Sequence, residues 1–223
     1  MIQIKSTLLG ADAPRVLTVP MIASVLADRR SVPARNTIFK WIREQVGNGA
    51  LRPVTRGLYI NQLASPRPAA AEAAAFVRGG AIVSLQTVLG EAGVTNNYSD
   101  IITCVVPHGP KQSPSVRPVR ANRIEYRFHA LPSRLLDSRA GELEDRMDLD
   151  VRYPRATPEK ALLDWLYLGA SPRTKLSLPP PDIDLGLLST NRLKRLAQAS
   201  GLQTQVKEYL SRVRLRERSV AEG

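Results

Sequence analysis

The stretch PARNTIFKWIREQVGNG, residues 33–49, decides how the first part of the chain is expected to fold. Proline is tolerated in the first turn of a helix, and the closing Gly-Asn-Gly favours the left-handed conformations that end one. We therefore expect a helix over residues 33–46. One side of it carries Ile38, Trp41, Ile42 and Gln45. The opposite side carries Asn36, Lys40 and Arg43 at helical spacing.

Three further elements are expected around this helix. Upstream, Thr18 is a suitable cap for a helix near Pro20, with an apolar face formed by Ile22, Val25 and Leu26. Downstream, residues 50–60 contain two β-prone runs around Thr55-Arg56-Gly57, which predicts a hairpin. An earlier helix is expected within residues 2–12, although residues 2–10 fit a strand equally well. Helix, short turn, helix and basic hairpin is the order of a winged helix-turn-helix domain.

This order predicts contact with double-stranded DNA, because a helix fits the major groove. The expected DNA-binding residues are Arg35, Asn36, Thr37, Lys40, Arg43, Arg52 and Arg56. Arg35, Asn36 and Lys40 are assigned to bases, since arginine pairs with guanine and asparagine with adenine. Arg43, Arg52 and Arg56 are assigned to the backbone. Two alternatives stay open: a solvated polar helix face, and a winged helix that binds protein.

Charge is concentrated at the two ends of the chain. The formal net charge is +12 and the pI about 10.4. Residues 1–61 carry nine Lys/Arg against three Asp/Glu, and residues 192–218 carry eight against two. Residues 62–191 are almost balanced, with fifteen against fourteen. Two basic ends on a neutral body favour a polyanionic partner, because phosphate contacts release counterions.

The remainder of the chain predicts mixed helices and strands. Expected helices cover residues 69–77, 85–92, 157–168, 190–199 and 202–213, and expected strands cover residues 82–84, 101–106, 124–131 and 151–153. A basic loop over residues 111–123 joins two of these strands. Thr157 is the expected cap of the helix that follows it. We expect Ala161, Leu162, Trp165 and Leu168 to fill a core.

Three segments resemble the AbiEi family of antitoxins from abortive-infection systems. YPRATPEKALLD, residues 153–164, is similar to the family's signature segment. RGLYI, residues 56–60, resembles the end of its winged helix, and GAIVSLQTVL, residues 80–89, resembles its next strand and helix. The resemblance implies an α+β fold: a winged helix-turn-helix domain over residues 1–64, and an antitoxin domain with a small sheet and several helices over residues 65–223. We expect a proline-rich spacer at 171–181 and basic helices over 189–218.

The resemblance also implies a function. Such an antitoxin binds inverted repeats in its operator DNA, represses its own operon, and neutralises a nucleotidyltransferase-like toxin without requiring a stable complex. The alternative is a protein- or RNA-interaction module that engages the toxin or its target directly, without specific DNA binding. A second candidate basic surface comprises Arg192, Lys194, Arg195, Lys207 and Arg212. It could touch DNA flanks, toxin or RNA, or be a solvated helix face.

No catalytic, metal or cofactor site is expected. His108 and His129 have no neighbours at the spacing of a metal motif. The carboxylate pairs at residues 148 and 150 and at 182 and 184 lack the upstream Gly-Ser turn of nucleotidyltransferases. Cys104, in an apolar run, is expected to be a buried thiol. No apolar run approaches the roughly 20 residues that cross a bilayer, so a cytoplasmic protein without a membrane partner is expected.

Overall fold

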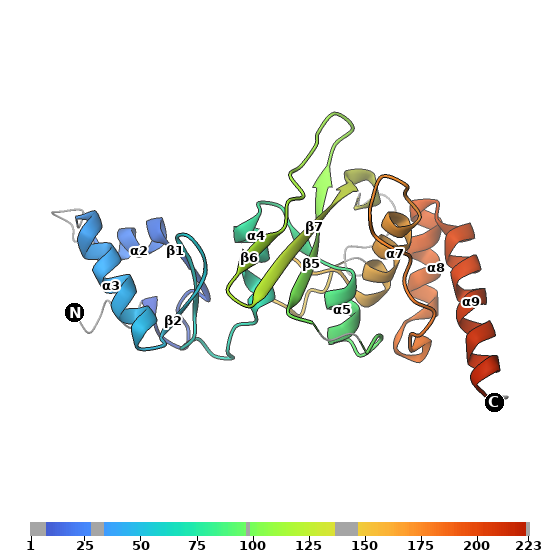
Figure 1. Ribbon diagram of the computed structural model, residues 1–223, viewed down its shortest axis with the longest axis horizontal. Coiled ribbons are helices and arrows are strands. Elements are labelled where there is room, and N and C mark those ends of the chain that lie inside the picture. Colours follow the sequence, from blue (N-terminus) through green and yellow to red (C-terminus); the bar gives the residue numbers. More distant parts are fainter. Residues whose placement is uncertain (1–7, 28–33, 97–98, 137–146, 222–223) are drawn as a thin grey trace. The chain divides into compact units, whose positions relative to one another are not determined.

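A computed structural model of the chain describes residues 8–27, 34–96, 99–136 and 147–221 (Figure 1). Over these residues the chain is a mixed α+β protein with a three-stranded and a four-stranded sheet. Its contacts define two compact units, one of residues 1–79 and 119–125 and the other of residues 80–118 and 126–223. Residues 65–79 therefore group with the first unit, and the expected domain boundary after residue 64 stays a prediction.

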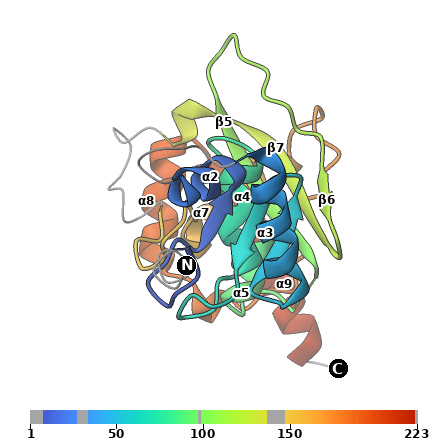
Figure 2. The ribbon, with the colours of Figure 1, turned by 90° about the vertical axis from the view of Figure 1, so that its left-hand side faces the viewer.

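Two consecutive helices, α2 (Val19–Leu26) and α3 (Arg35–Gly47), lie side by side in the first unit (Figures 1 and 2). Helix α2 begins as predicted, because Thr18 Oγ1 accepts a hydrogen bond from Met21 N at 3.3 Å. Helix α3 begins at Arg35 and ends one residue later than predicted. The expected first-turn proline, at position 33, lies outside the described residues, as does most of the helix expected within residues 2–12.

An antiparallel sheet completes this pair of helices. It comprises β1 (Val16–Thr18), β2 (Leu51–Thr55) and β3 (Leu58–Asn61), in the order β1-β3-β2. The predicted hairpin is confirmed, and its turn uses Gly57 at φ +82, a conformation that favours glycine. Strand β1 was not predicted, because it is short and flanked by prolines. Strand β2 is an edge strand, where Pro53 is tolerated because its missing N–H removes no central ladder bond.

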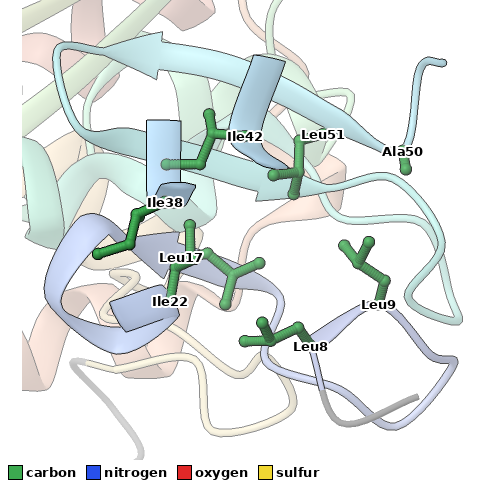
Figure 3. Close-up of a cluster of buried hydrophobic side chains, with 8 residues drawn as sticks. All are labelled: Leu8, Leu9, Leu17, Ile22, Ile38, Ile42, Ala50 and Leu51. Atoms are coloured by element: carbon green, nitrogen blue, oxygen red, sulfur yellow. The ribbon is translucent and has the colours of Figure 1, made fainter. Parts of the chain in front are cut away.

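The core of the first unit lies between the two helices and the hairpin. Figure 3 shows its buried side chains: Leu8, Leu9, Leu17, Ile22, Ile38, Ile42, Ala50 and Leu51. The predicted inner side of α3 is confirmed, since Ile38 and Ile42 belong to this cluster and Gln45 is also buried. Full burial of one such large apolar side chain contributes about 1.5–3 kcal/mol. The inner side of α3 therefore packs the helix onto the core of the first unit.

A partly buried ion pair ties the next segment to this unit. Arg15 Nε and Nη2 donate to the two carboxylate oxygens of Glu72 at 2.6 and 2.8 Å. Glu72 Oε1 also accepts from Ala69 N at 2.9 Å. The helix expected over residues 69–77 is confirmed in position, but its first half is a 3-10 helix, η1 (Ala70–Ala73), and only its second half is an α-helix, α4 (Ala74–Val77). Nine residues are too few for alanine propensity alone to impose an α-helix.

The four-stranded sheet has the order β4-β5-β7-β6. Its strands are β4 (Ile82–Val83), β5 (Ile101–His108), β6 (Val119–Ala121) and β7 (Ile124–Pro132), and α5 (Gln86–Glu91) follows β4. The strands predicted at residues 101–106 and 124–131 are confirmed. Strand β6 lies within the expected loop, and Asn122 links it to β7 at φ 56. Asparagine tolerates this left-handed conformation better than most residues.

Two of the segments that carry the family resemblance, residues 80–89 and 153–164, pair with each other in the second unit. Val83 N donates to Pro154 O at 2.9 Å, and Ala156 N donates to Val83 O at 2.8 Å. Helix α7 (Pro158–Gly169) follows, with Thr157 Oγ1 accepting from Lys160 N at 3.3 Å as the predicted cap. The four predicted core residues of this helix are all buried. The strand expected at residues 151–153 is wrong, because the backbone pairing falls on residues 154–156 instead.

The last part of the chain forms α8 (Thr190–Ser200) and α9 (Gln203–Ala221). Ser189 caps α8, not Thr190 or Asn191 as expected, and Gly201 ends α8 at φ 68 as predicted. Short 3-10 helices, η2 (Ser133–Leu135) and η4 (Leu185–Leu187), join longer elements. Within the described ranges no helix is both long and apolar enough to cross a membrane.

Candidate nucleic-acid interface

Helix α3 presents one continuous polar face to solvent. Its exposed members are Arg35, Asn36, Thr37, Lys40 and Arg43. On the opposite side Ile38 and Ile42 are only 6% and 3% exposed. The helical period thus brings all five predicted residues of α3 together without any of them contributing to the core. Their role in DNA contact stays a prediction.

The first turn of α3 places a cation where the helix dipole disfavours it. Arg35 is the first helical residue, no acidic residue lies in that turn, and Ala34 provides no side-chain cap. A cation at the positive end of a helix costs about 0.3–1 kcal/mol. Arg35 Cζ lies 5.5 Å from the centroid of the Phe39 ring. An exposed cation–π contact of this kind stabilises by about 0.5–1 kcal/mol. Arg35 therefore adds little net stability to the helix.

The hairpin contributes one accessible and one partly enclosed arginine. Arg56 is exposed in the turn between β2 and β3. The turn is fixed to the start of α2, because Val19 N donates to Gly57 O at 3.1 Å. Arg52, on β2, is half-buried, and its Nε is buried with no hydrogen-bond partner among the described residues. Arg56 is thus the better placed of the two for a large external partner.

The exposed cations of α3 and the hairpin are not neutralised by neighbouring acids. Among the described residues, no ion pair involves Arg35, Lys40, Arg43 or Arg56. Glu44 is exposed four residues after Lys40, the spacing of a helical ion pair, yet the two form none. The face of α3 is therefore positive, polar and available to a ligand that supplies negative charge.

The second candidate basic surface divides into different environments. Lys194 and Lys207 line a groove of about 490 Å³ between α8 and α9, together with Val206, Leu210 and Arg214. Arg192 is half-buried, and its Nη1 donates to Glu159 Oε2 at 3.3 Å. Arg195 and Arg212 are exposed. Only part of the predicted set is therefore a single concave surface, and Arg192 serves the packing of α8 on α7.

Sequence reasoning missed the surroundings of the two histidines. His108 lies at the end of β5, and His129 is half-buried on β7, where burial and then the Arg127 guanidinium lower its pKa. Both line one cavity in the second unit. The signal available in the sequence was weak, since the two histidines are distant along the chain. Across the described residues, no group of three or more His, Cys, Asp or Glu is arranged to hold a metal ion.

The predicted burial of Cys104 is confirmed, and its side chain is fully enclosed. Burial raises the pKa of this thiol to about 12. The thiolate, which is the reactive form, is therefore scarce near neutral pH.

Two comparisons with known proteins found no match. No protein-family model matches this chain. No curated protein matches it either.

Proposed function

We propose that this chain is a DNA-binding antitoxin that represses its own operon and neutralises a nucleotidyltransferase-like toxin. In this proposal the first unit acts as a winged helix-turn-helix domain, with α3 in the major groove and the β2–β3 hairpin as the wing. The order of α2, α3 and hairpin supports this assignment, since a helix-turn-helix reads bases through its second helix.

The observation that carries the DNA-binding proposal is the exposed face of α3. Arg35, Lys40 and Arg43 stand in solvent without acidic partners, and Arg35 stands where the helix dipole opposes it. A cluster of unpaired cations on one helix face attracts a polyanion. DNA phosphates supply the opposite charge, and the exposed Asn36 adds a side chain suited to adenine.

The antitoxin half of the proposal is supported by the family resemblance. The segments at residues 80–89 and 153–164 pair with each other through Val83 and Ala156. They also share a buried hydrogen bond, in which Ser84 Oγ donates to Asp164 Oδ2 at 2.8 Å. Two resembling segments that pack together form one structural unit, as parts of one inherited domain are expected to do.

The test of DNA binding uses the full-length protein and a labelled duplex from the region upstream of its own coding sequence. We expect this duplex to bind more tightly than a shuffled duplex, with an affinity that falls steeply with salt. Arg35→Ala, Lys40→Ala and Arg56→Ala should each weaken binding by about 1–3 kcal/mol, and loss of one phosphate contact should reduce the salt slope by about one. Fluorescence anisotropy measures both quantities.

Arg67→Ala is the matched control for these variants. Arg67 is an exposed arginine of the first unit that lies outside α3 and the hairpin, where it donates to Gln62 Oε1. It should leave duplex affinity almost unchanged. If all three test variants kept full affinity for the duplex, the DNA-binding surface would be elsewhere.

A second candidate function is a protein- or RNA-interaction module, favoured by the groove between α8 and α9. Its lysines surround apolar side chains, a combination suited to an acidic segment of a partner. Tight binding to the toxin encoded next to this gene, with no preference between the two duplexes, would favour this candidate. Rescue of growth by co-expression with that toxin tests the antitoxin activity itself.

A further inference from the structure

A cavity of about 700 Å³ lies entirely within the second unit. Its walls come from β7 and the end of β5, from the end of α7, and from the segment that follows α7. Figure 1 shows this segment, in orange, returning along α7. The volume falls within the range of about 300–1,000 Å³ that is usual for small-molecule sites.

The charged residues that line this cavity are all basic. They are Arg127, Arg173 and Lys175, and none of the lining residues is Asp or Glu. Arg173 and Lys175 are exposed, and neither forms an ion pair within the described part of the chain. A concave site with cations and no acids favours an anionic ligand, because the wall concentrates one sign of potential.

The rest of the wall is apolar and aromatic. Phe128 and Leu168 are buried, and Tyr167 is half-buried beside them. Arg134 Cζ lies 5.9 Å from the centroid of the Tyr167 ring and adds a further cation at this edge. Val116 is 45% exposed and adds an apolar side chain to the lining. This wall suits the flat apolar part of a ligand more than it suits a free inorganic anion.

The segment that carries Arg173 and Lys175 is held against α7 without any ligand. Thr174 Oγ1 donates to Leu168 O, and Trp165 Nε1 donates to Ser177 O at 2.8 Å. Gly169 allows the close approach, since a Cβ there would lie 2.9 Å from Leu178 Cα. The backbone that carries the two cations is thus already ordered, and an ordered segment loses less entropy when a ligand binds.

Both histidines of the chain line the same cavity. His108 Nδ1 lies 2.9 Å from Gly109 O. Its other ring nitrogen, Nε2, does not take part in this contact. His129 has a lowered pKa, so its ring is neutral at pH 7 and able both to donate and to accept a hydrogen bond. The cavity thus combines fixed positive charge with neutral hydrogen-bonding rings.

We propose that this cavity binds a nucleotide, free or at the end of a single strand, with phosphate at Arg173 and Lys175 and the base against Tyr167 and Phe128. The proposal is independent of operator binding by the first unit, since no residue of α3 or the hairpin takes part. It assigns a ligand site to a part of the second unit for which the sequence predicted none.

The two histidines make a direct test possible. In the full-length protein labelled at histidine, the imidazole NMR signals report only on this cavity, because the chain has two histidines and both line it. The probes are the four common ribonucleoside monophosphates, a short single-stranded RNA, the four nucleosides and inorganic phosphate. We expect saturable shifts of both signals with a mononucleotide or the RNA, at an affinity about tenfold or more above those for nucleoside and phosphate.

Arg173→Gln should weaken nucleotide binding about tenfold, whereas Arg152→Gln should not change it. Both arginines are exposed in the second unit, and only Arg173 lines the cavity. Stronger binding of RNA than of mononucleotide would identify a strand end as the ligand. No shift with any nucleotide, or equal binding of phosphate or nucleoside alone, would overturn the proposal. Equal effects of the two variants would overturn it as well.

Discussion

Helix α3 carries its charged residues in solvent, whereas helix α7 carries Glu159, Lys160 and Asp164 inside the protein. The buried three are 3%, 1% and 2% exposed. Lys160 Nζ donates to Asp164 Oδ1, and Glu159 Oε1 accepts from Ser189 N at 2.7 Å. The charges of α7 are therefore paired within the protein, and those of α3 are not.

This difference separates charges that maintain the fold from charges available for binding. A buried charge persists only where a partner and hydrogen bonds compensate its desolvation, so its removal disturbs the structure. An exposed charge without a partner costs little to remove. The signature segment of the resemblance is thus part of the packing of the second unit, while the candidate DNA contacts lie on the exposed side of a helix whose other side packs into the core.

The largest expected effect comes from breaking the buried pair of α7. Asp164→Ala leaves Lys160 Nζ and Ser84 Oγ buried without their acceptor. We expect the free energy of unfolding to fall by about 3–5 kcal/mol, as for other buried pairs that lose one member. Chemical denaturation followed by circular dichroism measures this loss.

A double variant supplies the control for this loss. Lys160→Met with Asp164→Asn removes both charges at similar volume and keeps an acceptor for Ser84 Oγ, so most of the lost stability should return. If Asp164→Ala changed the free energy of unfolding no more than an exposed substitution on α3 does, the contrast between the two helices would be wrong.

The last residues of the two helices offer a smaller and opposite pair of effects. A Cβ at Gly169 of α7 would meet Leu178 Cα and Ser177 O at 2.9 Å, whereas a Cβ at Gly47 of α3 would meet nothing within 4 Å. Gly169→Ala should therefore destabilise the protein by about 1–3 kcal/mol. Gly47→Ala should stabilise it by about 0.5–1 kcal/mol, because alanine loses less backbone entropy in a helix. If the two substitutions shifted the melting temperature in the same direction, this contrast would be wrong.

Local signals explain which parts of the fold were predictable. Helices α2 and α7 have capping threonines and apolar residues at helical spacing, so Thr18 and Thr157 mark their starts without any knowledge of the tertiary structure. Strands β1 and β6 have three residues each, and β1 pairs with β3 in a distant part of the chain. A pairing of this kind leaves no periodic pattern in so short a segment.

The same distinction applies to the candidate sites. The exposed face of α3 follows from its period, and the sequence therefore identified Asn36, Lys40 and Arg43 as outward residues. It did not reveal that Arg192 pairs with Glu159, because the two are 33 residues apart. The cavity was missed for the same reason, since its cations and histidines come from β5, β7 and the segment after α7.

A pair of substitutions before α3 tests whether the start of this helix approaches a phosphate. Ala34 precedes the helix and provides no side-chain cap, so Ala34→Ser should stabilise the protein by about 1 kcal/mol. Ala34→Asp should stabilise it at least as much, since a carboxylate also favours the positive end of the helix dipole. The two variants should differ on DNA, because only aspartate adds a charge that repels phosphate beside Arg35. We expect Ala34→Asp to weaken duplex binding and Ala34→Ser to leave it unchanged. Equal duplex affinity of these two variants in low salt would mean that the first turn of α3 lies away from the DNA backbone.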